Sequence, residues 1–287
     1  MTLPKKINVE NEAADNKQLT FRFYEVMNYP LPLEKDFFAY RSKRKVWLPS
    51  RFSCFSRKEK SDLMQDFLAF LGKWKFLYRN FPFVEQIFLA NSISFNALTP
   101  NSDIDLFVLS KEGRIWIARL LMSLILRFFW LKRSTKNEYQ RFCLSFFVDC
   151  GKMNLEPLLL HERDIYLPYW IAHLVPLYQE QRSSVFFQQN AWILRFLPNF
   201  PLQQLISLTW NLQEGRGKFK TCLEFLLNGK FWNCLEKIIA YFWGKRIARL
   251  QAKNPELHRG VIVSEGILKF HHDKREEYSE LFFWDKI

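Results

Sequence analysis

The chain has 287 residues, of which 48% are hydrophobic, and a formal net charge of +13. This apolar content is sufficient for a packed core and excludes a chain that is disordered over most of its length. The excess of Lys and Arg favours acidic partners, such as nucleic acid, nucleotide phosphates or an anionic membrane surface.

The cysteines and the apolar segments indicate a cytoplasmic protein without a transmembrane segment. Five cysteines are widely spaced and none forms a C-x-x-C pair, which argues against a zinc knuckle or a disulfide framework. Residues 1–17 lack the apolar segment of a signal peptide. The apolar runs 115–131 and 231–243 contain charges or are too short to span a bilayer. We expect amphipathic helices packed on a core there, with interfacial membrane contact as the alternative.

The N-terminal part of the chain predicts a tail and a helical appendage. Residues 1–17 are polar and read as a flexible tail. Residues 18–57 predict two short helices separated by Tyr29-Pro30, an arrangement typical of part of a winged-helix module. The basic stretch 41–60 carries aromatic neighbours that are able to stack on bases, although a solvated linker is the favoured interpretation.

Helices and strands alternate in residues 58–160, which predicts an α/β (α+β) core with a small mixed sheet. Short apolar runs rich in β-branched and aromatic residues indicate strands, and a longer run that follows Ser61, a good N-cap, indicates a helix. The elements expected in chain order are a helix at 61–80, a strand at 83–90, a helical turn at 92–98, a strand at 103–110, a helix at 114–131 and a strand at 141–149.

Residues 161–287 predict a C-terminal helical region. Prolines mark the breaks between its expected helices, and Asn228-Gly229 marks a break within the longest of them. The helices expected are 165–177, 183–196 and 219–252, followed by a charged surface helix at 265–287.

Asp103 and Asp105 predict a metal site. Residues two positions apart in a strand project to the same face, so the two carboxylates lie side by side and repel unless a cation lies between them. Mg²⁺ or Mn²⁺ suits such an oxygen-rich pair and retains coordination positions for phosphate oxygens. The pair therefore favours metal-assisted phosphoryl or nucleotidyl chemistry.

The segment IFLANSISFNALTPNSDIDLFVLS resembles the signature of the polymerase-β-type nucleotidyltransferase superfamily, a Gly-Ser turn followed by D-x-D on the next strand. Ser92, Asp103 and Asp105 match that pattern. The segments YEVMNYPLPLE, SDIDLFVLSKEGRIWIAR, FCLSFFVD and SEGILKFHHDKREEY are similar to bacterial nucleotidyltransferase-domain proteins. The resemblance implies transfer of a nucleoside monophosphate from an NTP to a hydroxyl acceptor, with Asp103 and Asp105 holding the metal ions.

Two positions depart from the family pattern. Asn91 stands where the family has Gly, and Asn tolerates a positive φ better than most residues. We expect Asn91, Ser92 and the neighbouring amides to hold phosphate. The third carboxylate of the family lies on the third strand, where Asp149 is the acid on the odd-numbered face of 141–149. We therefore expect Asp149 to complete the site and polarise the acceptor.

Two alternatives remain open. The first is a non-catalytic nucleotidyltransferase-fold protein that binds nucleic acid or a protein partner through its basic surface. The second is structural: Asp103 and Asp105 cap a turn and form ion pairs with basic neighbours.

Overall fold

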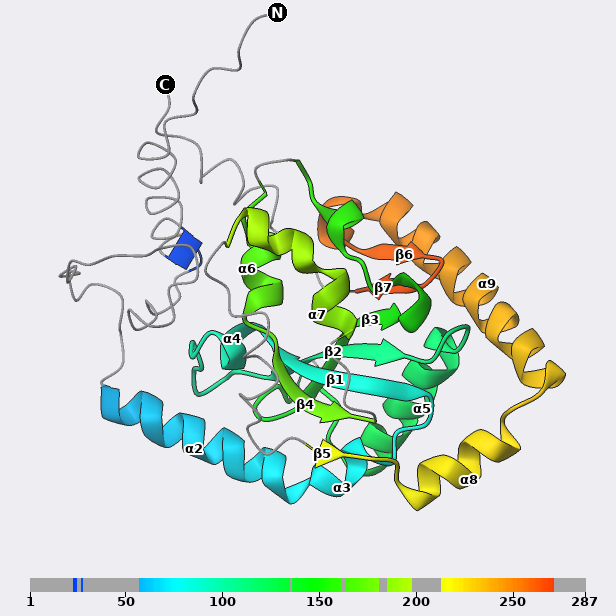
Figure 1. Cartoon of the computed structure of the whole chain (residues 1–287), viewed down its shortest axis with the longest axis horizontal. Helices are drawn as coiled ribbons and strands as arrows, with labels where there is room; N and C mark the ends of the chain where they lie inside the picture. The colour runs from blue at the N-terminus through cyan, green and yellow to red at the C-terminus, as the bar shows by residue number, and fades with distance from the viewer. Residues whose placement is uncertain are drawn as a thin grey trace, which may run out of the picture.

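The computed structural model describes residues 23–24, 27, 57–134, 136–161, 164–180, 185–197 and 213–270, which form a mixed α/β architecture around one sheet. The sheet has seven strands in the order β5-β4-β1-β2-β3-β7-β6 (Figure 1). The strands are β1 (Val84–Ala90), β2 (Ile104–Ser110), β3 (Phe142–Asp149), β4 (Val175–Gln179), β5 (Gln213–Glu214), β6 (Ile262–Ser264) and β7 (Ile267–Lys269).

The central strands are apolar along most of their length because helices cover both faces of the sheet, and most of their polar residues lie near the strand ends. β1 pairs antiparallel with both β2 and β4, whereas β2 pairs parallel with β3. All seven residues of β2 are buried. The parallel pairing places the beginnings of β2 and β3 at one end of the sheet and their final residues at the other.

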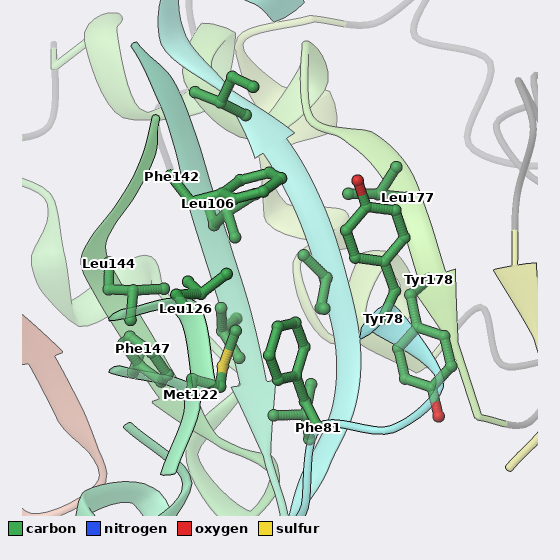
Figure 2. Packing of buried hydrophobic residues seen from close by; sticks show 14 of the residues in the cluster. Tyr78, Phe81, Leu106, Met122, Leu126, Phe142, Leu144, Phe147, Leu177 and Tyr178 are labelled. Carbon is green, nitrogen blue, oxygen red and sulfur yellow. The ribbon is translucent and has the colours of Figure 1, made fainter. Parts of the chain in front are cut away.

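The helices form a layer on each side of the sheet. One core cluster joins the sheet to α2, α3, α5 and α9, and Figure 2 shows part of it, including Leu106, Met122 and Leu126. The second cluster joins the other face to α6 and α7. The helices are α2 (Arg57–Lys73), α3 (Lys75–Tyr78), α4 (Asn91–Ser94), α5 (Ile115–Phe128), α6 (Tyr166–Ala172), α7 (Val185–Gln189), α8 (Lys218–Leu226) and α9 (Lys230–Lys253).

The structure confirms the predicted strands at 83–90, 103–110 and 141–149 to within one residue at each end, and the helix predicted at 114–131 is α5. The break predicted at Asn228-Gly229 separates α8 from α9. No helix among the described residues is long and apolar enough to cross a bilayer.

The helical prediction for 161–287 is wrong for four segments, since β4, β5, β6 and β7 all join the same sheet. The apolar run predicted as one helix at 165–177 contains α6 and the beginning of β4, because a buried strand and a buried helix both read as continuous apolar sequence. Within the surface helix predicted at 265–287, residues 267–269 are strand β7. Gly266 adopts a φ of 86° in the hairpin that joins β6 to β7.

The appendage predicted at 18–57 lies outside the described residues, apart from Phe23, Tyr24, Met27 and the first residue of α2. Phe23 and Tyr24 are buried in the second cluster, and the Phe23 ring stacks on Tyr169 with centroids 4.6 Å apart. The basic stretch 41–60 and the residues of 271–287 also fall outside the part of the chain whose side chains are described.

Candidate metal and nucleotide site

The turn after β1 brings Asn91 and Ser92 to the end of the sheet where Asp103 and Asp105 lie. Ala90, the last residue of β1, pairs with Asp105 in the antiparallel register. Asn91 follows with a φ of 54°, in the left-handed region that favours Gly and is tolerated by Asn. The chain therefore turns directly beside the two carboxylates, as the sequence predicts for this segment.

Asn91 holds Asp105 through its side chain. The Asn91 Nδ2 group donates to Asp105 Oδ2 at 2.8 Å, and Asn91 Oδ1 accepts from Trp170 Nε1 at 2.9 Å. The Trp170 indole stacks on Phe146 with ring centroids 5.3 Å apart, which fixes this chain of contacts to the sheet. Asp105 is buried, and its Oδ1 atom has no hydrogen-bond partner among the described residues. One oxygen of Asp105 is thus committed and the other is free to bind a cation.

Asp103 is paired with a cation of the chain itself. Its Oδ2 atom lies 3.0 Å from Arg133 Nη1, and Arg133 Nη2 lies 2.7 Å from Glu138 Oε1. Burial and then the charge of Asp105 raise the pKa of Asp103 to about 6, against the lowering influence of Arg133. Arg133 therefore does not compensate fully for the repulsion between the two acids, and a second cation near them is electrostatically favourable.

Cys143 occupies the position beside the acid pair on the third strand. It pairs with Asp105 in the parallel β2–β3 register, and one ligand atom from each of Asp103, Asp105 and Cys143 lies within 4.8 Å of the others. Burial, followed by the charges of Asp105 and Asp103, raises the pKa of the Cys143 thiol to about 12. The thiol is therefore protonated at neutral pH, and two carboxylates are the charged ligands of this group.

The prediction that Asp149 completes the site is wrong. Asp149 pairs with Ser110 at the other end of β2, five residues or roughly 16 Å along the strand from Asp105. Its carboxylate accepts from the Gly113 N–H at 2.7 Å and from the Gly151 N–H at 2.8 Å. The parallel direction of β3 explains the difference, because the residue beside Asp105 must come from the beginning of β3 and not from its end. Asp149 organises two loops.

Ser92 lies where the sequence places it, next to Asn91 and half-buried at the end of β1. Its carbonyl accepts from the Ala97 N–H at 2.7 Å, which closes the turn between α4 and β2. Position alone therefore supports a role for Ser92 near a bound phosphate.

Sequence reasoning missed Arg133, Cys143 and Trp170. Cys143 was detectable in principle, since a crossover helix between two strands predicts parallel pairing and hence a partner at the beginning of the third strand. Arg133 lies in the connection between α5 and β3, and Trp170 comes from α6, far along the chain. No spacing rule links either residue to the D-x-D motif.

The residues fit a hard divalent cation such as Mg²⁺ at the acid pair. The free Oδ1 atom of Asp105 and the raised pKa of Asp103 both mark a group that a cation would stabilise. The protonated thiol of Cys143 is a poor ligand for Mg²⁺, which prefers oxygen. The fit therefore rests on Asp103 and Asp105, with the remaining positions left for water and phosphate oxygens.

A cleft of about 1310 Å³ lies at the opposite end of the sheet and includes Asp149 among its lining residues. Two acids of this cleft, Glu224 and Glu236, are engaged within the chain. Glu224 Oε1 accepts from the Phe83 N–H, and Glu236 accepts from backbone N–H groups at the beginning of α5. The cleft and the acid pair thus lie at opposite ends of the sheet, and we take the acid pair as the site because the buried Oδ1 atom of Asp105 has no hydrogen-bond partner among the described residues.

In comparisons with known proteins, no protein-family model matches the chain, and no curated protein or solved structure matches it significantly.

Proposed function

We propose that this protein has a site of the nucleotidyltransferase type, which binds an NTP together with a divalent cation at Asp103 and Asp105. The observation that carries the proposal is the pair of adjacent, largely buried carboxylates, one with a free oxygen and the other with a raised pKa. Such a pair is costly for the fold unless a cation offsets the repulsion. A cytoplasmic location, where NTP and Mg²⁺ are both available, fits this proposal.

Each neighbouring residue has a distinct task in this proposal. Asn91 fixes the orientation of Asp105, and Trp170 fixes that of Asn91. Arg133 restrains Asp103 and is partly exposed, so that it can also pair with a phosphate group. Mg²⁺, when bound, supplies charge neutralisation for the triphosphate and lowers the pKa of an attacking hydroxyl.

Transfer of the nucleoside monophosphate to a hydroxyl is the reaction that an intact D-x-D pair supports. The position of the third carboxylate is occupied by Cys143, whose thiol is protonated at neutral pH, and Asp149 lies roughly 16 Å away along the sheet. The acceptor hydroxyl then lacks a carboxylate of this set to receive its proton. The two-acid geometry favours nucleotide binding without efficient transfer, as in a non-catalytic descendant that recognises nucleic acid or a protein partner.

Calorimetry of Mg²⁺ and ATP binding separates these possibilities when it is combined with a transfer assay on labelled ATP. Wild type is expected to bind ATP only when the metal is present, and Asp105→Asn is expected to lose that dependence. Asp149→Asn is the matched control and is expected to retain it. Equal metal-dependent ATP binding by wild type and Asp105→Asn contradicts the proposed site. Release of pyrophosphate by wild type, abolished in Asp105→Asn, assigns transfer activity to it.

A further inference from the structure

The outer faces of α8 and α9 carry exposed apolar side chains, while their inner faces contact the sheet and α5 and line the cleft described above. In the inner contacts, Glu224 of α8 accepts from the Phe83 N–H and from Lys111 Nζ, the latter at 2.7 Å. Glu236 of α9 accepts from the N–H groups of Trp116 and Ile117 at 2.8 and 2.9 Å. These contacts anchor both helices to the sheet and to α5, and they leave the opposite faces outward along one edge of the molecule (Figure 1).

Large apolar side chains cover this outward surface. Phe231 is 70% exposed, Phe242 65%, Leu226 63% and Tyr241 61%. In α9, Phe231, Ile238 and Phe242 share one side of the helix because they are seven and four positions apart. An exposed stripe of this length on a helix that already packs by its other face indicates a second contact surface.

The charges on this surface all have one sign. The acids of α8 and α9 are Glu224 and Glu236, and both are buried in the inner contacts. The exposed charged residues of the two helices are Lys218, Lys230, Lys237, Lys245, Arg246, Arg249 and Lys253. Lys237 borders the cleft, so the outward surface combines aromatic and aliphatic side chains with the six other cations, and neither helix has an exposed anion.

We propose that the outer faces of α8 and α9, here called the α8–α9 surface, bind an anionic lipid bilayer as an interfacial platform. Helices with Phe, Trp and Leu beside Lys and Arg lie in the plane of the headgroups, and each cation near an anionic leaflet adds to the attraction. Lys245 lies 5.5 Å from the Tyr241 ring centroid on this surface. Such a pair places the ring at the boundary and the cation among the phosphates.

Two other partners fit this surface less well. A second copy of the chain would bring the cations of one copy against the same cations of the other across a symmetric interface, which opposes association. A nucleic acid would satisfy the cations and stack on Phe or Tyr, but it offers no apolar environment for Leu226 and Ile238, which are also exposed. A lipid surface satisfies both the cations and the aliphatic side chains.

Flotation of the full chain with phosphatidylcholine vesicles, with and without phosphatidylserine, tests the proposal. Wild type is expected to float with the phosphatidylserine vesicles and to dissociate as salt is raised, because the attraction is partly electrostatic. Phe231→Ser with Phe242→Ser is expected to lose at least about tenfold in vesicle affinity, and so is Lys245→Glu with Arg249→Glu. Circular dichroism should be unchanged in both variants, since these side chains are exposed.

Matched controls come from other elements. Val185→Ser removes an exposed apolar side chain at the beginning of α7, and Lys136→Glu reverses an exposed charge between α5 and β3. Both are expected to float like wild type. Failure of wild type to float with phosphatidylserine vesicles overturns the proposal, and so does equal loss in the controls. If wild type instead binds an oligouridylate, or dimerises in sedimentation, through the same four side chains and ignores the vesicles, the surface has a different partner. The outcome of these vesicle, oligouridylate and sedimentation experiments does not depend on nucleotide binding at Asp105.

Discussion

Asp105 lies directly opposite Cys143 in the parallel pairing of β2 and β3. Replacing Cys143 with Asp would add a third carboxylate beside the pair. We expect Cys143→Asp to bind Mn²⁺ with ATP at least about tenfold more tightly than wild type. A tenfold gain in affinity corresponds to ~1.4 kcal/mol, which is a small part of the interaction between unit charges at ~4 Å near a protein surface. Calorimetry measures the affinity, and pyrophosphate release shows whether transfer activity appears.

The matched control for this gain is Cys143→Asn, which has the shape of Asp without its charge. It is expected to bind no more tightly than wild type. Equal affinities of Cys143→Asp and Cys143→Asn would show that the third-strand position does not reach the metal.

Asp149 has a structural role that is measurable apart from any nucleotide. Its two oxygens accept from the N–H groups of Gly113 and Gly151. In Asp149→Asn one of these N–H groups faces an amide NH₂ and loses its partner, which costs about 1–3 kcal/mol. Chemical denaturation should show this loss while metal-dependent ATP binding stays unchanged. An unaltered denaturation midpoint would contradict the role assigned to these two contacts.

Asn91 combines a backbone requirement with a side-chain requirement, and two substitutions separate them. Both Asn91→Gly and Asn91→Ala remove the contacts to Asp105 and Trp170. Only Asn91→Ala is also destabilised by the backbone φ of 54°, by about 1–2 kcal/mol, because Ala has a Cβ atom and Gly does not. We expect Asn91→Ala to be the less stable of the two by about that amount, as measured by urea unfolding. Equal stabilities would mean that the turn relaxes out of the left-handed conformation.

Gly at position 91, as in the family pattern, would let a phosphate approach the backbone more closely, which favours NTP binding by Asn91→Gly at least as tight as that of wild type. The structure gives the Asn91 amide a role in orienting Asp105. The same variant therefore tests whether closer approach of the phosphate or orientation of Asp105 matters more for NTP affinity, as measured by calorimetry with Mg²⁺.

His173 predicts a pH dependence of stability. Its Nδ1 atom donates to the Tyr169 carbonyl and its Nε2 atom accepts from the Tyr24 hydroxyl, both at 2.8 Å, which fixes the neutral imidazole. Burial lowers the pKa of His173 to about 4, from 6.5 in an unfolded chain. The unfolded state thus takes up the proton first. The contribution of neutral His173 to the free energy of unfolding is fully present above pH 6.5, and the free energy of unfolding falls by up to roughly 3 kcal/mol as the pH drops to 4.

Thermal unfolding between pH 4 and pH 7 checks this prediction in His173→Gln, which should lose most of that dependence. His258→Gln is the control because His258 ends the short 3-10 helix that follows α9 and is only half-buried. A pH profile of His173→Gln as steep as that of wild type would place the titration in another group.

The local parts of the site were predictable from the sequence and the long-range parts were not. The strand–turn–strand unit from β1 to β2 depends on short-range patterns, so Asn91, Ser92, Asp103 and Asp105 lie together as expected. The partner on β3 depends on strand direction and register, and the odd-numbered face of 141–149 holds both Cys143 and Asp149, of which Asp149 was expected because it is the acid. A bulge between Asp105 and Phe107 also breaks the odd–even alternation of this pairing.

The outer strands of the sheet were not predictable from the sequence for a related reason. β4 and β7 flank β1 and β3, but they are encoded in the C-terminal half of the chain by short apolar runs. Periodicity does not distinguish such a run from a buried helix segment, and only pairing with a distant strand decides between them.

The flanking positions of β4 and β7 have a consequence for the independence of the predicted core. A fragment ending at residue 160 would expose the unpaired edges of β1 and β3, two long apolar strands with no charge along most of their length. Open edges of this kind recruit other chains and aggregate. Residues 58–160 are therefore not a separable module. The smallest cooperative unit must extend at least to β7, and folding has to wait for contacts between residues more than a hundred positions apart.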